Sequence, residues 1–195
     1  MVTTVGTTQE FLANIPPFDR LSKEAVSRLT ASTQLLRYRM GQPISVKEKM
    51  PAHVAILFEG QARLLGYDPN SAVPTTLQRL TSGAILGWVS LVRGVSCETV
   101  IASTEAVCIA IPATIFMKLL EQEPEFAAYF TDRPALVEVF DLLAMDLKGR
   151  ADSDRVLKSA GAEDLRQLAI KVLAAANIVN LNGDSTSGDR LNHDY

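Results

Sequence analysis

Eight short runs of β-branched and aliphatic residues constrain the fold of this chain more than any other feature of its sequence. Gly, Pro, Asn or Asp closes each run, and the runs recur at intervals of roughly 8 to 12 residues, which is typical of sandwiches and barrels. Gly41, Gly60 and Gly83 lie between runs, where tight reversals favour a left-handed backbone. The predicted fold class is mainly β with flanking helices (α+β). The runs are 35–40, 43–46, 53–58, 62–67, 75–80, 84–86, 99–103 and 106–111.

Apolar residues at helical spacing precede the strand region. Phe11, Leu12 and Ile15 form one such pattern, and Ser22 stands just before a second one that begins at Glu24. The Ser22 hydroxyl is suited to accept a hydrogen bond from a free amide of the first turn. Two N-terminal helices are therefore expected.

Helical spacing returns after Pro112, and Pro124 and Pro134 are placed to begin further helices. A last helix is expected over 163–174, after a charged stretch at 148–158, and 178–181 is interpreted as a short strand-like run. The expected organisation is N-terminal helices over 1–33, a β-roll over 34–122, a C-terminal helical extension over 123–181 and a disordered tail over 182–195.

One of these C-terminal helices carries a continuous apolar stripe that must be covered. Packing on the chain's own roll is the default expectation, and a homodimer or a neighbouring domain are the alternatives. The stripe consists of Leu136, Val137, Phe140, Leu143 and Leu147.

Two segments resemble the cyclic nucleotide-binding domain family. Phe58 to Leu64, with the sequence FEGQARL, is similar to that family's "EGxxRL" hairpin, and Leu80 to Gly87, LTSGAILG, is similar to its "PGdxfGE" turn. Together with Tyr38 to Ile44 the resemblance covers about Phe11 to Gln122. It implies a double-stranded β-helix, or jelly roll, of the cyclic nucleotide-binding type.

The resemblance also implies a phosphate-binding cassette from Leu86 to Thr99. Family members bind the ribose hydroxyl with a glutamate after the glycine equivalent to Gly87, and neutralise the cyclic phosphate with an arginine near the end of the cassette. Trp88 and Ser96 stand at these two positions here. The candidate pocket residues are Leu86, Gly87, Trp88, Val89, Ser90, Leu91, Arg93, Ser96, Cys97 and Thr99.

Loss of both charged groups predicts weak or lost binding of cyclic AMP and cyclic GMP. Charge-assisted hydrogen bonds contribute roughly 1.5 to 3 kcal/mol each. Without both, affinity falls by about two to four decades at ~1.4 kcal/mol per decade. Amides of a short helix at 90–93 still attract an anion. Arg93 is able to swing toward that anion, whereas Glu98 opposes it.

Two of the candidate residues have alternative interpretations. The Trp88 indole either fills the space that the ribose takes in relatives, which is the favoured interpretation, or stacks on a base or aromatic ligand. Cys97, like Cys108, lies in an apolar segment, which favours a buried reduced thiol over a redox sensor.

A closer resemblance extends over Leu80 to Ser103, together with the sequences MGQPI and GQARLLGYDPN. These segments look similar to a regulatory or structural domain that precedes peptidase-containing ABC exporters in bacteria, particularly cyanobacteria. The resemblance implies an exporter partner. The sequence has no phosphate loop, no membrane-spanning apolar run and no cysteine with a histidine partner, so the sensor-like module alone is expected.

Charge and composition bear on the other functions considered. The totals are 22 acidic and 19 basic residues, of which 14 and 9 lie from Pro112 onward, leaving 8 and 10 before it. An acidic C-terminal part is a poor surface for DNA phosphates. This argues against nucleic-acid binding and against the alternative function, a catabolite-activator-type transcription regulator whose DNA-binding domain would be truncated or missing.

Enzymatic activity is not expected, and neither is a resident cofactor. A cupin-like enzyme needs a metal cluster, but His53 and His193 are the only histidines and neither has ligand spacing, so no metal site is predicted. No signal sequence or bilayer-spanning segment is evident, and a cytoplasmic protein without membrane insertion is expected. The predicted function is a cyclic nucleotide-binding-like regulatory domain, acting as a sensor or interaction module.

Overall fold

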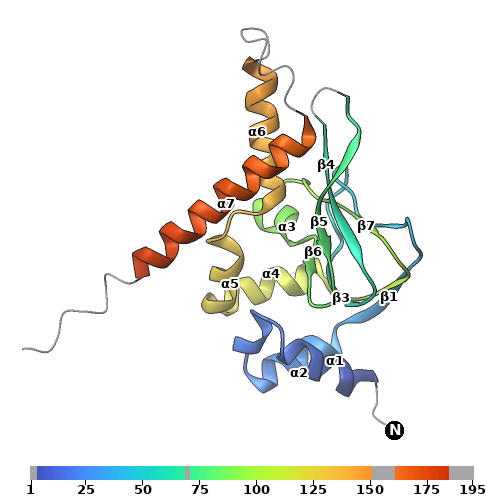
Figure 1. Cartoon of the computed structure of the whole chain (residues 1–195). Helices are drawn as coiled ribbons and strands as arrows, with labels where there is room; N and C mark the ends of the chain where they lie inside the picture. The colour runs from blue at the N-terminus through green and yellow to red at the C-terminus, as the bar shows by residue number, and fades with distance from the viewer. Residues whose placement is uncertain (1–3, 69–70, 151–160, 185–195) are drawn as a thin grey trace, which may run out of the picture.

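A computed structural model describes residues 4–68, 71–150 and 161–184 (Figure 1). The helices are α1 (Thr4–Ala13), the 3₁₀ turn η1 (Phe18–Arg20), α2 (Lys23–Ala31), α3 (Trp88–Arg93), α4 (Ala113–Gln122), α5 (Pro124–Thr131), α6 (Leu136–Arg150) and α7 (Ala162–Asp184). The strands are β1 (Gln34–Tyr38), β2 (Pro43–Ser45), β3 (His53–Glu59), β4 (Ala62–Tyr67), β5 (Pro74–Leu80), β6 (Ile85–Leu86), β7 (Thr99–Ala102) and β8 (Ala106–Pro112).

The strands form two four-stranded sheets, with orders β1-β8-β3-β6 and β2-β7-β4-β5. Within each sheet, every pair of neighbouring strands is antiparallel. Each of the eight predicted runs is a strand, and Gly41, Gly60 and Gly83 have φ values of 82°, 87° and 91° at the reversals. The prediction of a mainly β fold with flanking helices is confirmed.

The sheet β1-β8-β3-β6 is buried on both faces. Along β3, Ala55 and Leu57 point into the core between the two sheets, whereas Val54 and Ile56 point into a second core on the other face. The N-terminal helices and α4 and α5 cover that second face, as Figure 1 shows. Burial on both faces explains why the runs read as continuously apolar instead of alternating.

The predicted starts of α2 and α5 agree with the structure, whereas Ile15 of the first predicted helical pattern lies outside α1, which ends at Ala13. The Ser22 side chain accepts a hydrogen bond from the Ala25 amide at 3.1 Å, which confirms it as the N-cap of α2. Pro124 occupies the first turn of α5, also as expected. Pro112, by contrast, ends β8, and α4 begins at Ala113. Pro134 also lies outside the helix that it was expected to begin, because α6 starts at Leu136.

The prediction of a strand-like run at 178–181 is wrong, because α7 continues to Asp184. A four-residue apolar run has no readable period. The alanines at 174–176 are strong helix formers that carry the helix through it. Residues 182–184 are therefore also helical, while the rest of the predicted tail lies outside the described residues.

The apolar stripe on α6 packs on the roll of its own chain. Val137 and Phe140 are 2% and 0% exposed in the core between the sheets, and Leu136 and Leu143 are half-buried against it. The Leu147 side chain lies outside the described part. For the described stripe residues the default expectation is confirmed, and the homodimer stays a prediction. Among the described helices, none is long and apolar enough to cross a membrane.

Candidate functional site

The cassette connects the two sheets at one end of the roll. It leaves β6 at Leu86, turns at Gly87 with φ 80°, forms α3, turns again at Gly94 with φ 69° and enters β7 at Thr99. A side chain at Gly87 would combine a left-handed backbone with a Cβ 3.3 Å from the His53 carbonyl oxygen. Glycine at this position lets the backbone reverse directly into α3.

The first turn of α3 is capped by a carboxylate from the chain itself. Glu98, only 4% exposed, accepts a hydrogen bond from the Val89 amide at 3.1 Å. Burial raises the pKa of Glu98 to about 7, against the opposing effect of hydrogen bonds from the amides of Ser90, Val89 and Gly87. Of the amides at 90–93 that were expected to attract an anion, that of Ser90 donates to Glu98, together with the amides of Gly87 and Val89 just before that range. The Glu98 side chain thus lies at the start of α3, where an external anion would bind.

Arg93 points away from these amides. Its Nε donates to Glu138 Oε1 at 2.6 Å and its Nη2 to Glu138 Oε2 at 3.3 Å. The same guanidinium donates to the carbonyl oxygens of Thr131 at 3.4 Å and Arg133 at 3.1 Å. Hydrogen bonding to Glu138 raises the pKa of Arg93. The arginine therefore fastens α3 to the start of α6, and its predicted swing toward a ligand would break these contacts.

Trp88 packs between the cassette and the helical layer. Its ring lies 5.2 Å from that of Phe130 on α5, and the side chain contacts both cores. Val89 is buried in the core between the sheets, and Leu91 packs against the second core. The indole thus has a packing role, and the predicted filling of a ribose pocket stays a prediction.

The polar cassette residues form hydrogen bonds within the cassette and with the segment that follows β2. Ser90 Oγ accepts a hydrogen bond from the Cys97 amide at 3.1 Å, and Ser96 Oγ donates to the Val46 carbonyl at 3.3 Å. Thr99 Oγ1 accepts from the Lys47 amide at 3.1 Å. These side chains hold the cassette in one conformation.

Neither cysteine has the properties of a reactive thiol. Cys97 and Cys108 are both unpaired, and burial raises the pKa of each thiol, that of Cys108 to about 12. A thiol with a raised pKa carries little thiolate at neutral pH. Within the part of the chain that the structure describes, no group of three His, Cys, Asp or Glu side chains is placed to hold a metal ion.

A second ion pair holds α6 on the roll. Lys47, after β2, donates to Asp141 at 2.5 Å, one helical turn from Glu138. The sequence reasoning missed Lys47, Asp141 and Glu138, because all three read as surface charges. The only available signal was the three-residue spacing of Glu138 and Asp141, which places both on one face of α6.

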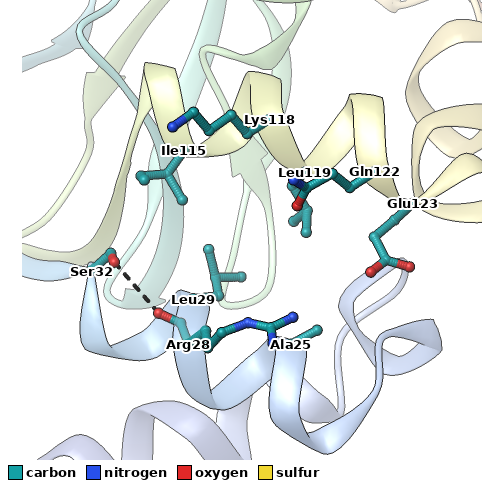
Figure 2. A pocket seen from close by; sticks show the side chains of 9 residues that line it. All are labelled: Ala25, Arg28, Leu29, Ser32, Ile115, Lys118, Leu119, Gln122 and Glu123. Atoms are coloured by element: carbon teal, nitrogen blue, oxygen red, sulfur yellow. Dashed lines mark hydrogen bonds between the residues drawn. The ribbon is translucent and has the colours of Figure 1, made fainter.

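Two hollows lie outside the cassette. One, of about 160 Å³, separates α2 from α4 (Figure 2). Leu29, Ile115 and Leu119 form its apolar floor, while Arg28 and Lys118 reach over its rim from opposite helices. The other, of about 640 Å³, lies beside β5, α6 and α7. No cassette residue lines either of them.

The sequence of the roll matches a known domain family. The sequence model of the cyclic nucleotide-binding domain family matches residues 35–123. The two-sheet roll with flanking helices has the jelly-roll arrangement of that family. No curated protein matches the sequence.

Solved structures share the fold at low identity. The regulatory domain of Toxoplasma gondii PKA with cAMP aligns with TM-score 0.57 and 14% identity over 74% of this chain and 50% of that one. A cyclic nucleotide binding protein of Ruegeria pomeroyi, described as putative, aligns with TM-score 0.56 and 16% identity. The alignment covers 78% of this chain and 65% of that one. The sensor domain of the transcriptional regulator DNR from Pseudomonas aeruginosa aligns with TM-score 0.58 and 14% identity over 80% and 97%. This chain thus spans half to two thirds of the first two.

Proposed function

We propose that this chain is a regulatory domain of the cyclic nucleotide-binding type in which the cassette is held closed by the chain's own side chains. Binding of cyclic AMP and cyclic GMP is weak or lost, and the domain works as an interaction module without catalytic activity of its own. The single observation that carries this proposal is the Glu98 carboxylate on the amides of α3.

Electrostatics explains why Glu98 opposes a cyclic phosphate. With a pKa of about 7, Glu98 is about half ionised at neutral pH. Where it is ionised, it and a phosphate charge about 4 Å away repel by about 4 kcal/mol at an effective dielectric constant of about 20. A phosphate on the same amides would have to displace Glu98 or stand beside it. Trp88 and Ser96 supply no compensating charge, and Arg93 is engaged with Glu138.

The identities of the structural neighbours are consistent with a regulatory role. They include the regulatory domain of a kinase and the sensor domain of a transcriptional regulator. No feature of the described residues favours the catabolite-activator alternative, since the candidate dimer stripe on α6 is covered by its own roll. The exporter partner and the cytoplasmic location stay predictions.

The direct test is to titrate cyclic AMP and cyclic GMP into the protein. Trp88 is the only tryptophan, and it lies in the cassette, so its fluorescence reports on ligand entry. Calorimetry provides a second readout. We expect no saturation below millimolar nucleotide. Saturable binding of either nucleotide at micromolar concentration would refute the proposal.

Paired variants test the role assigned to Glu98. Ser96→Arg restores the phosphate-binding charge, and Glu98→Ala then removes the internal anion. The double variant should bind cyclic AMP at least tenfold more tightly than Ser96→Arg alone. Ser96→Arg combined with Glu105→Ala is the control, because Glu105 is an exposed turn residue outside the cassette. Equal affinity of the double variant and Ser96→Arg would remove Glu98 from the explanation.

A further inference from the structure

The larger hollow borders a strand edge that has no neighbouring strand among the described residues. β5 is the last strand in the order β2-β7-β4-β5, so one side of its backbone faces outward. Leu136 of α6 and Ile170 and Leu173 of α7 form the opposite wall of this hollow of about 640 Å³. We call it the β5 groove, lined by Arg79, Leu136, Arg166, Ile170 and Leu173.

The wall formed by α7 opens toward solvent. Ala169 is fully buried, whereas Leu168, Ile170 and Val172 are 45%, 36% and 43% exposed, so the faces of α7 on either side of Ala169 are open to solvent. Arg166 donates to the Leu77 carbonyl at 2.7 Å and covers the edge of β5 there. Beyond Arg166 the groove offers an apolar wall beside an open strand edge.

Two arginines next to the groove lie opposite each other without a compensating charge. Arg79 of β5 pairs in register with Arg63 of β4, and both side chains are exposed. Like charges placed directly opposite on a sheet are destabilising. Within the described part of the chain, neither guanidinium forms an ion pair or side-chain hydrogen bond. Arg166, in contrast, is paired with Glu163 at 2.9 Å.

We propose that the β5 groove binds an extended segment of another protein that carries one or two carboxylates among apolar side chains. The open edge of β5 supplies main-chain hydrogen bonds, as in recognition by strand addition. Ile170, Leu173 and Leu136 take the apolar side chains. Arg79, with Arg63 beside it, forms ion pairs with the carboxylates, which offsets the repulsion between the two arginines.

Charge favours such a segment over nucleic acid. A nucleic acid carries a negative charge on every phosphate. The first turn of α7 presents Glu163 and Asp164 next to the groove, in a chain with a net charge of −3. One or two carboxylates can reach the arginines without meeting these residues, whereas a continuous phosphate backbone cannot.

A random peptide library displayed on phage, selected on the full chain, tests the proposal. Enriched peptides should combine Asp or Glu with aliphatic or aromatic residues. Their affinity is then measured by fluorescence anisotropy with synthetic copies. Failure to enrich any sequence, or enrichment of peptides without acidic residues, would overturn the proposal.

Matched variants localise the binding. Arg79→Glu should weaken binding of the enriched peptides at least tenfold, whereas Arg37→Glu should change it less than twofold. Arg37 is likewise an exposed arginine on an edge strand, but in the other sheet. Peptides that bind both variants equally would contradict the site.

A second pair of variants covers the apolar wall. Ile170→Glu should also weaken binding at least tenfold, with Leu142→Glu as the control, because Leu142 is 67% exposed on α6 outside the groove. Unchanged binding to Ile170→Glu would rule out this wall. Displacement of the peptides by heparin or single-stranded DNA at equal affinity would show a general anion patch and overturn the proposal.

Discussion

The Phe140 ring of α6 lies so close to Gly66 of β4 that a Cβ at Gly66 would be 2.6 Å from Phe140 Cε1 and 2.9 Å from Leu77 Cδ2. α6 can therefore insert its aromatic side chain between the sheets only because β4 has no side chain at this point. The packing of the C-terminal helices on the roll therefore depends on two residues together. Gly66 leaves the space on β4, and the Phe140 ring of α6 fills it.

Gly66→Ala should destabilise the fold by about 1 to 3 kcal/mol, because the added methyl group overpacks a filled core. The free energy of unfolding in urea measures this. Gly161→Ala is the control, since its Cβ would meet nothing closer than Asp164 Oδ2 at 4.0 Å. If both variants unfold at the same urea concentration, the close approach does not constrain α6.

Phe140→Ala should cost about 3 to 5 kcal/mol, since the ring is fully buried and its removal leaves a cavity. Leu142→Ala, two residues on and 67% exposed, should change stability by less than about 0.5 kcal/mol. Because Phe140 packs within its own chain, the loss should not depend on protein concentration. A loss that grows on dilution would instead place Phe140 in a subunit interface.

Glu98→Gln should flatten the pH dependence of stability. Burial raises the pKa of Glu98 from 4.5 to about 7, so the folded state binds a proton that the unfolded state releases between these values. The contribution of Glu98 is fully present below pH 4.5 and falls as pH rises to 7, by up to about 3 kcal/mol. Urea unfolding from pH 5 to pH 8 measures the slope.

Glutamine keeps an oxygen for the α3 amides but cannot ionise, so relative to wild type the variant should gain stability across this pH range. Glu105→Gln, on an exposed turn, is the control and should keep the wild-type slope. An unchanged slope in Glu98→Gln would mean that the buried carboxylate does not titrate there.

Arg93 and Glu138 should show a coupling free energy of about 1 kcal/mol in a double-mutant cycle of Arg93→Ala and Glu138→Ala. Their side chains are 31% and 22% exposed, so solvent screens part of the attraction. The coupling should shrink at high salt. If the stability losses of the two single variants add up to the loss of the double variant, the pair does not fasten α3 to α6.

The strands of the roll can be predicted from local sequence patterns. Runs such as 53–58 and 106–111 are apolar, of strand length and bounded by turn residues, and these local properties are sufficient to place all eight strands. The glycine reversals and the Ser22 cap are equally local, whereas the cassette segment from Leu86 to Thr99 was implied by the resemblance to the family. The apolar run at 178–181 was misread because four residues cannot distinguish strand from helix.

The contacts of the cassette residues, by contrast, depend on how distant segments pack in three dimensions. Glu98 and the Val89 amide that donates to it are nine residues apart, and Arg93 and Glu138 are forty-five residues apart. Whether a charged side chain faces a ligand, a helix end or solvent depends on the backbone path between such residues, which short-range patterns do not contain. For the same reason the Phe140 and Gly66 contact and the β5 groove appear only once distant segments are brought together.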